Sequence, residues 1–268
     1  MCGRYFRRSE KQQLAERFRA GKVFEDPLLP DYNIAPTTFQ PVIRLNRDTG
    51  EREMALLRWG LVPFFASSLK EFKGISTINA KAESVATSAT WREPFKRRRC
   101  LIPADGFYEW AEKAAEIPRP GMRPKPPSKG TSRSGRQPYA ITLGDGEPMA
   151  IAGLWDAWKE PKKSPQEVDR WLQSFAMVTI EANELMATIH TRMPVILRER
   201  DWAEWLERDD TRPAPAHLLR PYDADEMKME PANTAVGNVR NNGPEMLKAN
   251  EGAKGSELLD GPGMLIEQ

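Results

Sequence analysis

Short runs of β-branched and aromatic residues recur along the chain, each bounded by Gly, Pro or Asp. Such runs predict β-strands. We expect strands at residues 41–46, 54–61, 100–110, 138–143, 148–155 and 174–182. The turn sequence LGDGEP joins the fourth of these runs to the fifth and is typical of a hairpin. The pattern therefore predicts a mostly antiparallel β core.

Helical periodicity is limited to short segments. Leu14 and Phe18 share one face of an amphipathic helix expected over residues 10–20, which the capping-box pair Ser9 and Gln12 would begin. A second helix is expected over 199–208 because its tryptophans form an apolar stripe for the core. With no internal repeat or convincing linker, we expect one α+β domain with a mostly antiparallel β core and short flanking helices.

Two segments lack any apolar pattern. Residues 113–137 are dense in Pro, Gly, Ser and basic residues, which predicts an inserted flexible basic loop. Residues 248–268 are expected to form a loose C-terminal tail, which leaves 1–247 as the folded domain.

Composition narrows the class of protein. Hydrophobic residues make up 40% and charged residues 29% of 268 positions, as in ordinary soluble globular proteins. No run approaches the ~18 apolar residues that span a bilayer, and no apolar segment follows the basic residues at the start of the chain. We therefore expect a cytoplasmic protein that does not bind membranes.

Cysteine and histidine are scarce. The chain has two cysteines, Cys2 and Cys100, and two histidines, so neither a disulfide framework nor a zinc site is expected. We predict no metal and no cofactor. The net charge of +2 does not decide whether the protein binds nucleic acid, although basic residues crowd the first eleven positions and 96–99. Such clusters suit phosphate binding or a solvated surface equally well.

Cys2 is the first candidate for chemistry. Removal of Met1 would expose a thiol and an α-amine on adjacent carbons, with ordinary pKa values of about 8.5 and about 8. A 1,2-aminothiol condenses with an aldehyde to an imine and then closes to a thiazolidine. An N-terminal cysteine could also be an amidohydrolase nucleophile, and an incidental buried cysteine is the third possibility.

Other candidates could move protons or bind phosphate. Strand alternation places Glu109 opposite its aromatic neighbours, either in a cleft, where its pKa would rise, or in solvent, which the pattern slightly favours. His190 is a proton shuttle or a structural histidine. Arg192, two positions on, could bind phosphate beside it, and Asn79 and Lys81 have the same spacing, with an amide for a substrate and a cation for phosphate.

Eight sequence blocks together resemble the SOS-response-associated peptidase family. In order they are MCGRY, YNIAPT, RWGLVP, INAKAES, RRCLIPADGFYEW, AGLW, IHTRMPVIL and AVGNVRNNGPEM, and they run from residue 2 to about 247. The resemblance implies a barrel-like β core and a protein that recognises abasic sites in single-stranded DNA and captures them covalently. It implies a monomer in the bacterial cytoplasm that associates with the nucleoid when bound to DNA.

The resemblance also implies site roles. Cys2 would expose itself by removing Met1 and form the thiazolidine crosslink, and Asn79 would hydrogen-bond the opened sugar. Glu109 would transfer protons in forming and reversing the crosslink. His190 would act on the sugar hydroxyl or on an imine.

The DNA contacts follow in the same way. The resemblance places Arg4, Lys81 and Arg192 on the DNA backbone and Asn33 in the pocket. Phe64 and Phe65 would stack on neighbouring bases where the family often has tryptophan, and Lys81 stands where arginine is frequent. Two alternatives stay open: a thiol peptidase that acts on proteins, and a non-covalent single-stranded DNA binder.

Overall fold

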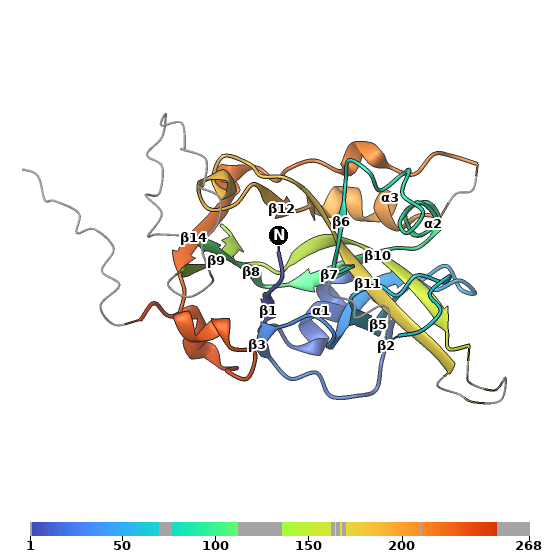
Figure 1. The fold of residues 1–268 in the computed structure, drawn as a ribbon, viewed down its shortest axis with the longest axis horizontal. Coiled ribbons are helices and arrows are strands. Elements are labelled where there is room, and N and C mark those ends of the chain that lie inside the picture. Colours follow the sequence, from blue (N-terminus) through green and yellow to red (C-terminus); the bar gives the residue numbers. More distant parts are fainter. Residues whose placement is uncertain are drawn as a thin grey trace, which may run out of the picture.

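The computed structural model describes residues 2–69, 77–111, 136–161, 164, 167, 170–208 and 211–250 (Figure 1). The strands are β1 (Tyr5–Arg7), β2 (Lys22–Val23), β3 (Asp31–Ile34), β4 (Phe39–Leu45), β5 (Arg52–Trp59), β6 (Asn79–Lys81), β7 (Arg99–Ala104), β8 (Gly106–Ala111), β9 (Gln137–Leu143), β10 (Met149–Lys159), β11 (Trp171–Glu181), β12 (Arg192–Pro194), β13 (Ile196–Leu197) and β14 (Met227–Pro231). The helices are α1 (Lys11–Phe18), α2 (Arg92–Arg97) and α3 (Trp202–Leu206), with short 3-10 turns η2 (Met186–Thr188), η3 (Glu199–Asp201), η4 (Ala216–Leu218), η5 (Ala224–Glu226), η6 (Thr234–Gly237) and η7 (Pro244–Leu247). No helix among these residues is long and apolar enough to cross a bilayer.

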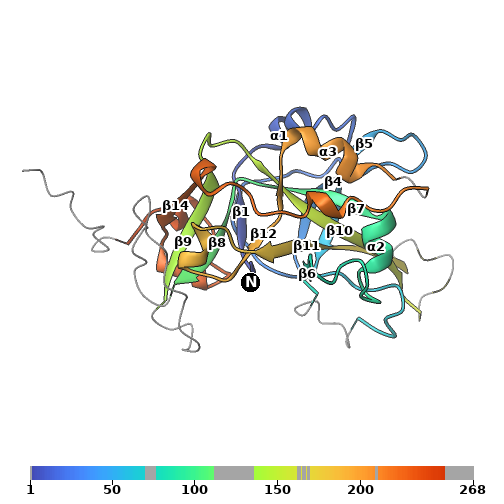
Figure 2. The same ribbon diagram turned by 90° about the horizontal axis from the view of Figure 1, so that it is seen from above.

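Five strands close into a barrel. The sheet order β11-β10-β7-β4-β5 is antiparallel throughout, and a parallel pairing of β5 with β11 joins its two ends. A second sheet, in the order β14-β9-β8-β1-β3, lies beside the barrel and contains the N-terminal strand (Figure 2). The expected α+β fold with a barrel-like, mostly antiparallel core is confirmed.

Strand alternation separates two apolar cores. Side chains such as Leu57, Trp59 and Phe175 fill the barrel, while the opposite faces of the same strands carry a second cluster, with Leu101 and Ala176 among its members. The apolar stripes of α1 and α3 cover that outer cluster. The predicted role of the two amphipathic helices in core packing is therefore confirmed.

The segment expected to be one strand over 100–110 is two strands separated at Asp105. β7 belongs to the barrel and β8 to the second sheet. The buried Asp105 carboxylate accepts hydrogen bonds from the backbone N–H groups of Arg8 and Ser9, at 2.8 and 2.9 Å, and from the Ser9 hydroxyl at 2.7 Å. Ser9 is therefore not the cap of α1, and Glu10 begins the helix with Gln13 as its capping-box partner.

The hairpin expected between 138–143 and 148–155 is wrong. β9 pairs with β8 and β14, whereas β10 pairs with β7, β11 and β13. The chain does turn here, with Gly146 at a φ of 77°, but the turn carries it from the second sheet into the barrel.

The boundaries of the two non-periodic segments shift slightly. Gln137 already belongs to β9, and most of the predicted insertion, 112–135, lies outside the described residues. At the C-terminal end, Asn250 accepts a hydrogen bond from the Thr234 backbone N–H at 2.8 Å. The rest of the predicted tail, 251–268, also lies outside the described residues.

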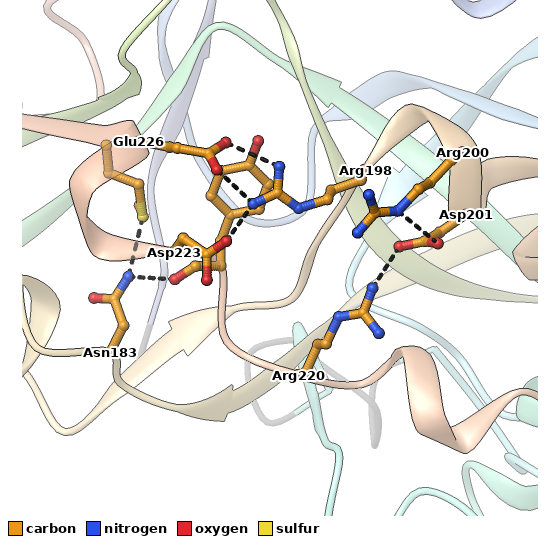
Figure 3. A network of polar contacts seen from close by, with 9 residues as sticks. Asn183, Arg198, Arg200, Asp201, Arg220, Asp223 and Glu226 are labelled. Carbon is orange, nitrogen blue, oxygen red and sulfur yellow. Dashed lines mark hydrogen bonds and ion pairs between the residues drawn. The ribbon is translucent and has the colours of Figure 1, made fainter.

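A polar network fastens the chain before β14 to the turn after β13 (Figure 3). Arg198 forms a bidentate ion pair with Glu226, at 2.9 and 2.6 Å, and a second pair with Asp223. Arg220 bonds Asp201 at 2.9 Å. Asp223 and Glu226 are largely exposed, so solvent screens their pairs with Arg198, and the network acts mainly by joining two segments that are distant in sequence.

We expect Asp105→Ala to destabilise the fold by about 2–4 kcal/mol, because it leaves three donors without their buried acceptor. Urea unfolding followed by tryptophan fluorescence measures the loss. Asp225→Ala is the control: this exposed aspartate should change the unfolding free energy by less than about 0.5 kcal/mol. Equal midpoints for the two variants would show that Asp105 does not hold β1 against the β7–β8 corner.

Candidate functional site

Cys2 lies in the interior beside the first strand. Its side chain is 1% exposed, and its sulfur is 3.7 Å from the carbonyl oxygen of Arg4. The side-chain amide of Asn79, at the start of β6, donates a hydrogen bond of 2.8 Å to the Cys2 carbonyl. Two sequence-predicted residues that are 77 positions apart are thus in direct contact.

Glu109 joins them from β8. This strand pairs with β1, and the backbone N–H of Tyr108 donates to the Arg4 carbonyl at 2.9 Å. The Glu109 side chain is 6% exposed, so the solvent-facing alternative for this residue is wrong. The pattern could not decide this point because the second sheet places both faces of β8 against other parts of the fold.

The environment of Cys2 favours the neutral thiol. Burial, followed by the negative charge of Glu109, raises the pKa of Cys2 to about 12, and a hydrogen bond to the Arg4 backbone opposes the rise only in part. At neutral pH the thiol is therefore protonated, and a sulfur nucleophile requires a neighbouring group that accepts its proton.

Asn79 has spare hydrogen-bonding capacity. Its side chain is 8% exposed, and its Oδ1 atom has no hydrogen-bond partner within the described part of the chain. Buried polar atoms are normally satisfied. The free acceptor beside Cys2 therefore suits a ligand that brings a hydroxyl or amine donor.

Arg4 and Asn33 lie together but face inward. Arg4 Nη1 donates to Asn33 Oδ1 at 2.8 Å, and Asn33 Nδ2 donates to the carbonyls of Asn238 and Asn241 at 2.9 and 2.7 Å. Both side chains are buried. They brace β1 and β3 against the loop that follows η6, and their contacts with DNA stay a prediction.

His190 and Arg192 lie close together at the start of β12, which pairs with β11. The Arg192 backbone N–H donates to His190 Nδ1 at 2.9 Å, so the histidine ring folds back on its neighbour. The Arg192 guanidinium forms a bidentate pair with Glu83, at 2.5 and 3.0 Å, and also bonds the Thr179 carbonyl at 2.6 Å. A phosphate would therefore have to compete with Glu83 for this cation.

Glu83 is the residue that sequence reasoning missed here. It lies two positions after Lys81 in the block INAKAES, and Lys81 is exposed at the end of β6. Lys81 faces Thr179 across the parallel pairing with β11, while Arg192 approaches β11 from its other side. The available signal was an acidic residue only two positions from Lys81, a predicted phosphate contact.

Phe64 and Phe65 are separate from this group. They follow β5 on a loop and are 60% and 50% exposed, with ring centroids 5.4 Å apart in an edge-on arrangement. Beneath them Val62 and Ala66 pack on Trp158. Two exposed aromatic rings suit stacking against a flat partner.

No group of three His, Cys, Asp or Glu residues that could hold a metal is present in the described ranges.

Comparisons with known proteins identify relatives across nearly the whole chain. The family model described as SOS response associated peptidase (SRAP) matches residues 1–239. The chain is 34% identical to the abasic site processing protein YoqW of Bacillus subtilis over 251 residues, which covers 93% of this chain and 100% of that protein. It is 30% identical to the abasic site processing protein HMCES of Rattus norvegicus, with coverage of 83% and 65%.

Solved structures agree with the fold. A protein of Bacteroides thetaiotaomicron superimposes with a TM-score of 0.73 at 21% identity, covering 93% of this chain and 100% of that one. A protein of Bordetella bronchiseptica gives a TM-score of 0.66 at 27% identity, with coverage of 87% and 100%.

Proposed function

Because the chain belongs to the SOS response associated peptidase family, we propose that it processes abasic sites in single-stranded DNA by capturing the ring-opened sugar covalently through Cys2. The named relatives supply the substrate class, since they are abasic site processing proteins. The observation that carries the mechanism is the hydrogen bond from Asn79 to the Cys2 carbonyl, with the Glu109 charge acting on the same thiol.

The proposed reaction has two steps. After Met1 is removed, the α-amine of Cys2 condenses with the aldehyde of the opened sugar, which forms an imine and releases water. The Cys2 sulfur then adds to the imine carbon, and the thiol proton moves to the imine nitrogen. The product is a five-membered thiazolidine that links protein and DNA, and the reverse steps release it.

Glu109 has the role of proton carrier in this scheme. A thiol whose pKa is about 12 gains nucleophilicity only when a base takes its proton. Glu109 accepts that proton and returns it to nitrogen, and it moves the proton in the opposite direction during reversal. His190 acts as a proton shuttle for the sugar hydroxyl or for the imine.

Asn79 and the cations hold the strand. The amide nitrogen of Asn79 fixes the cysteine backbone, and its unsatisfied Oδ1 accepts a hydrogen bond from the opened sugar. Lys81, Arg192 and Arg4 contact phosphates, with Arg192 exchanging Glu83 for DNA, and Asn33 keeps Arg4 in place. An abasic nucleotide suits the buried surroundings of Cys2 because it has no base to be accommodated.

The test compares an abasic strand with an intact strand of the same sequence. We expect a heat-stable adduct with the abasic strand alone, and an intact protein mass that lacks the initiator methionine. Salt-dependent binding without preference for the abasic strand would support a non-covalent binder instead. Turnover of a peptide substrate without an adduct would favour the peptidase alternative.

A further inference from the structure

Three polar side chains that lie in a row across neighbouring barrel strands hold the loop that carries Phe64 and Phe65. Arg58 on β5 pairs with Ser174 on β11, and Ser174 pairs with Asp156 on β10. Paired residues on neighbouring strands present their side chains on the same face. The row therefore places three polar groups side by side on the outside of the barrel, although the residues lie far apart in sequence.

Each of these groups meets the backbone of the loop at a different point. Arg58 Nη1 donates to the Gly60 carbonyl at 2.9 Å, and the Val62 backbone N–H donates to the Ser174 hydroxyl at 2.8 Å. Burial raises the pKa of the Asp156 carboxyl, and the Phe64 backbone N–H is among the groups that oppose this rise. Alternate loop residues, Gly60, Val62 and Phe64, thus interact in turn with residues of β5, β11 and β10.

The attachments at Ser174 and Asp156 are buried and leave little room for adjustment. The Ser174 side chain is 0% exposed and that of Asp156 is 3% exposed, and Arg98 neutralises Asp156 at 3.2 Å. On the apolar side, the indole Nε1 of Trp158 donates to the Ala66 carbonyl at 2.7 Å. The loop backbone is therefore fixed on both sides of the two exposed rings.

We propose that Ser174, with Asp156 beside it, is a positioning residue that presents Phe64 and Phe65 for stacking on DNA bases next to the lesion. The proposal rests on the proposed function. A ring on a loose loop must lose conformational freedom when it stacks, whereas a loop that is already fixed in the free protein avoids most of that cost. Stacking on one base contributes about 1–3 kcal/mol. A loop that is ordered before binding keeps more of this free energy than a loose one.

The first measurement is the crosslinking rate of Ser174→Ala with an abasic strand at subsaturating concentration. We expect a fall of about five- to tenfold, because a loosened loop loses part of the stacking gain. The reaction of the same variant with glycolaldehyde, which has no bases to stack, should proceed at the wild-type rate. Trp171→Ala is the matched control: this aromatic on the same strand is 53% exposed and should leave both rates unchanged.

A double-mutant cycle separates positioning from general destabilisation. In a Phe64→Ala, Phe65→Ala background, Ser174→Ala should cause no further fall, because the rings it positions are gone. An equal fall in both backgrounds would overturn the positioning role. Asp156→Asn serves as a second variant if Ser174→Ala folds poorly, and it should follow the same non-additive pattern.

Hydrogen exchange on the wild-type protein tests the same role without substitution. The amides of Val62 and Phe64 should exchange slowly in the free protein, and fast exchange at both would contradict a fixed loop. A wild-type protein that fails to crosslink abasic strands would contradict the proposed function itself, while additive loss in the cycle would contradict only the role of Ser174.

Discussion

Replacing Cys2 by alanine is expected to reduce the heat-stable adduct with abasic DNA to background. In a Cys2→Ala sample whose intact mass confirms that Met1 has been removed, the α-amine at position 2 is still present, so condensation with the aldehyde can proceed. Without sulfur the imine cannot close to the ring and hydrolyses on denaturation. Borohydride should therefore trap an adduct of Cys2→Ala with abasic DNA, although none survives heating without reduction.

The other cysteine supplies the control. Cys100 is fully buried in the barrel, and burial raises its pKa well above the ordinary thiol value. Cys100→Ala should form the heat-stable adduct as the wild type does. A heat-stable adduct with Cys2→Ala, or its loss in Cys100→Ala, would refute the thiazolidine mechanism. Absence of the borohydride-trapped species would show that the amine does not react first.

Local pattern predicted the fold where one principle dominates. Bounded runs of β-branched and aromatic residues identified most barrel strands, and the stripes of α1 and α3 identified the helices that cover them. The pattern failed at Asp105 and at the turn near Gly146, where the chain passes between the sheets. A change of sheet depends on long-range pairing, and turn chemistry is the same whether or not the flanking strands pair.

For the site, too, the sequence predicted some features, while others depend on contacts between distant strands. Residue chemistry identified Cys2, and the structure places Asn79 and Glu109 against it. The sequence could not show that Arg4 and Asn33 bond each other or that Glu83 holds Arg192, because those contacts join distant strands. The supports of the Phe64 loop were invisible for a similar reason, since Ser174 and Asp156 become neighbours only across a strand pair.

Substituting Glu109 by glutamine is expected to change two reactions of Cys2 in opposite directions. The Glu109 charge raises the pKa of the thiol, so removing that charge lowers the pKa from its value of about 12. At any pH below that value a larger fraction of the thiol is ionised in the variant, and alkylation by iodoacetamide should become faster. The rate–pH curve for Cys2 should shift to lower pH.

Crosslinking should nevertheless become slower, because glutamine cannot carry a proton. General acid–base groups typically contribute 10²–10⁴-fold, so we expect both adduct formation and transfer to a competing abasic strand to slow by about 100-fold or more. Glu230→Gln, an exposed glutamate in the same sheet, should alter neither rate. If Glu109→Gln slowed alkylation and crosslinking equally, loss of the local fold would explain the result. If it left alkylation unchanged, the carboxylate would not act on the thiol, and its assignment as proton carrier would have to be abandoned.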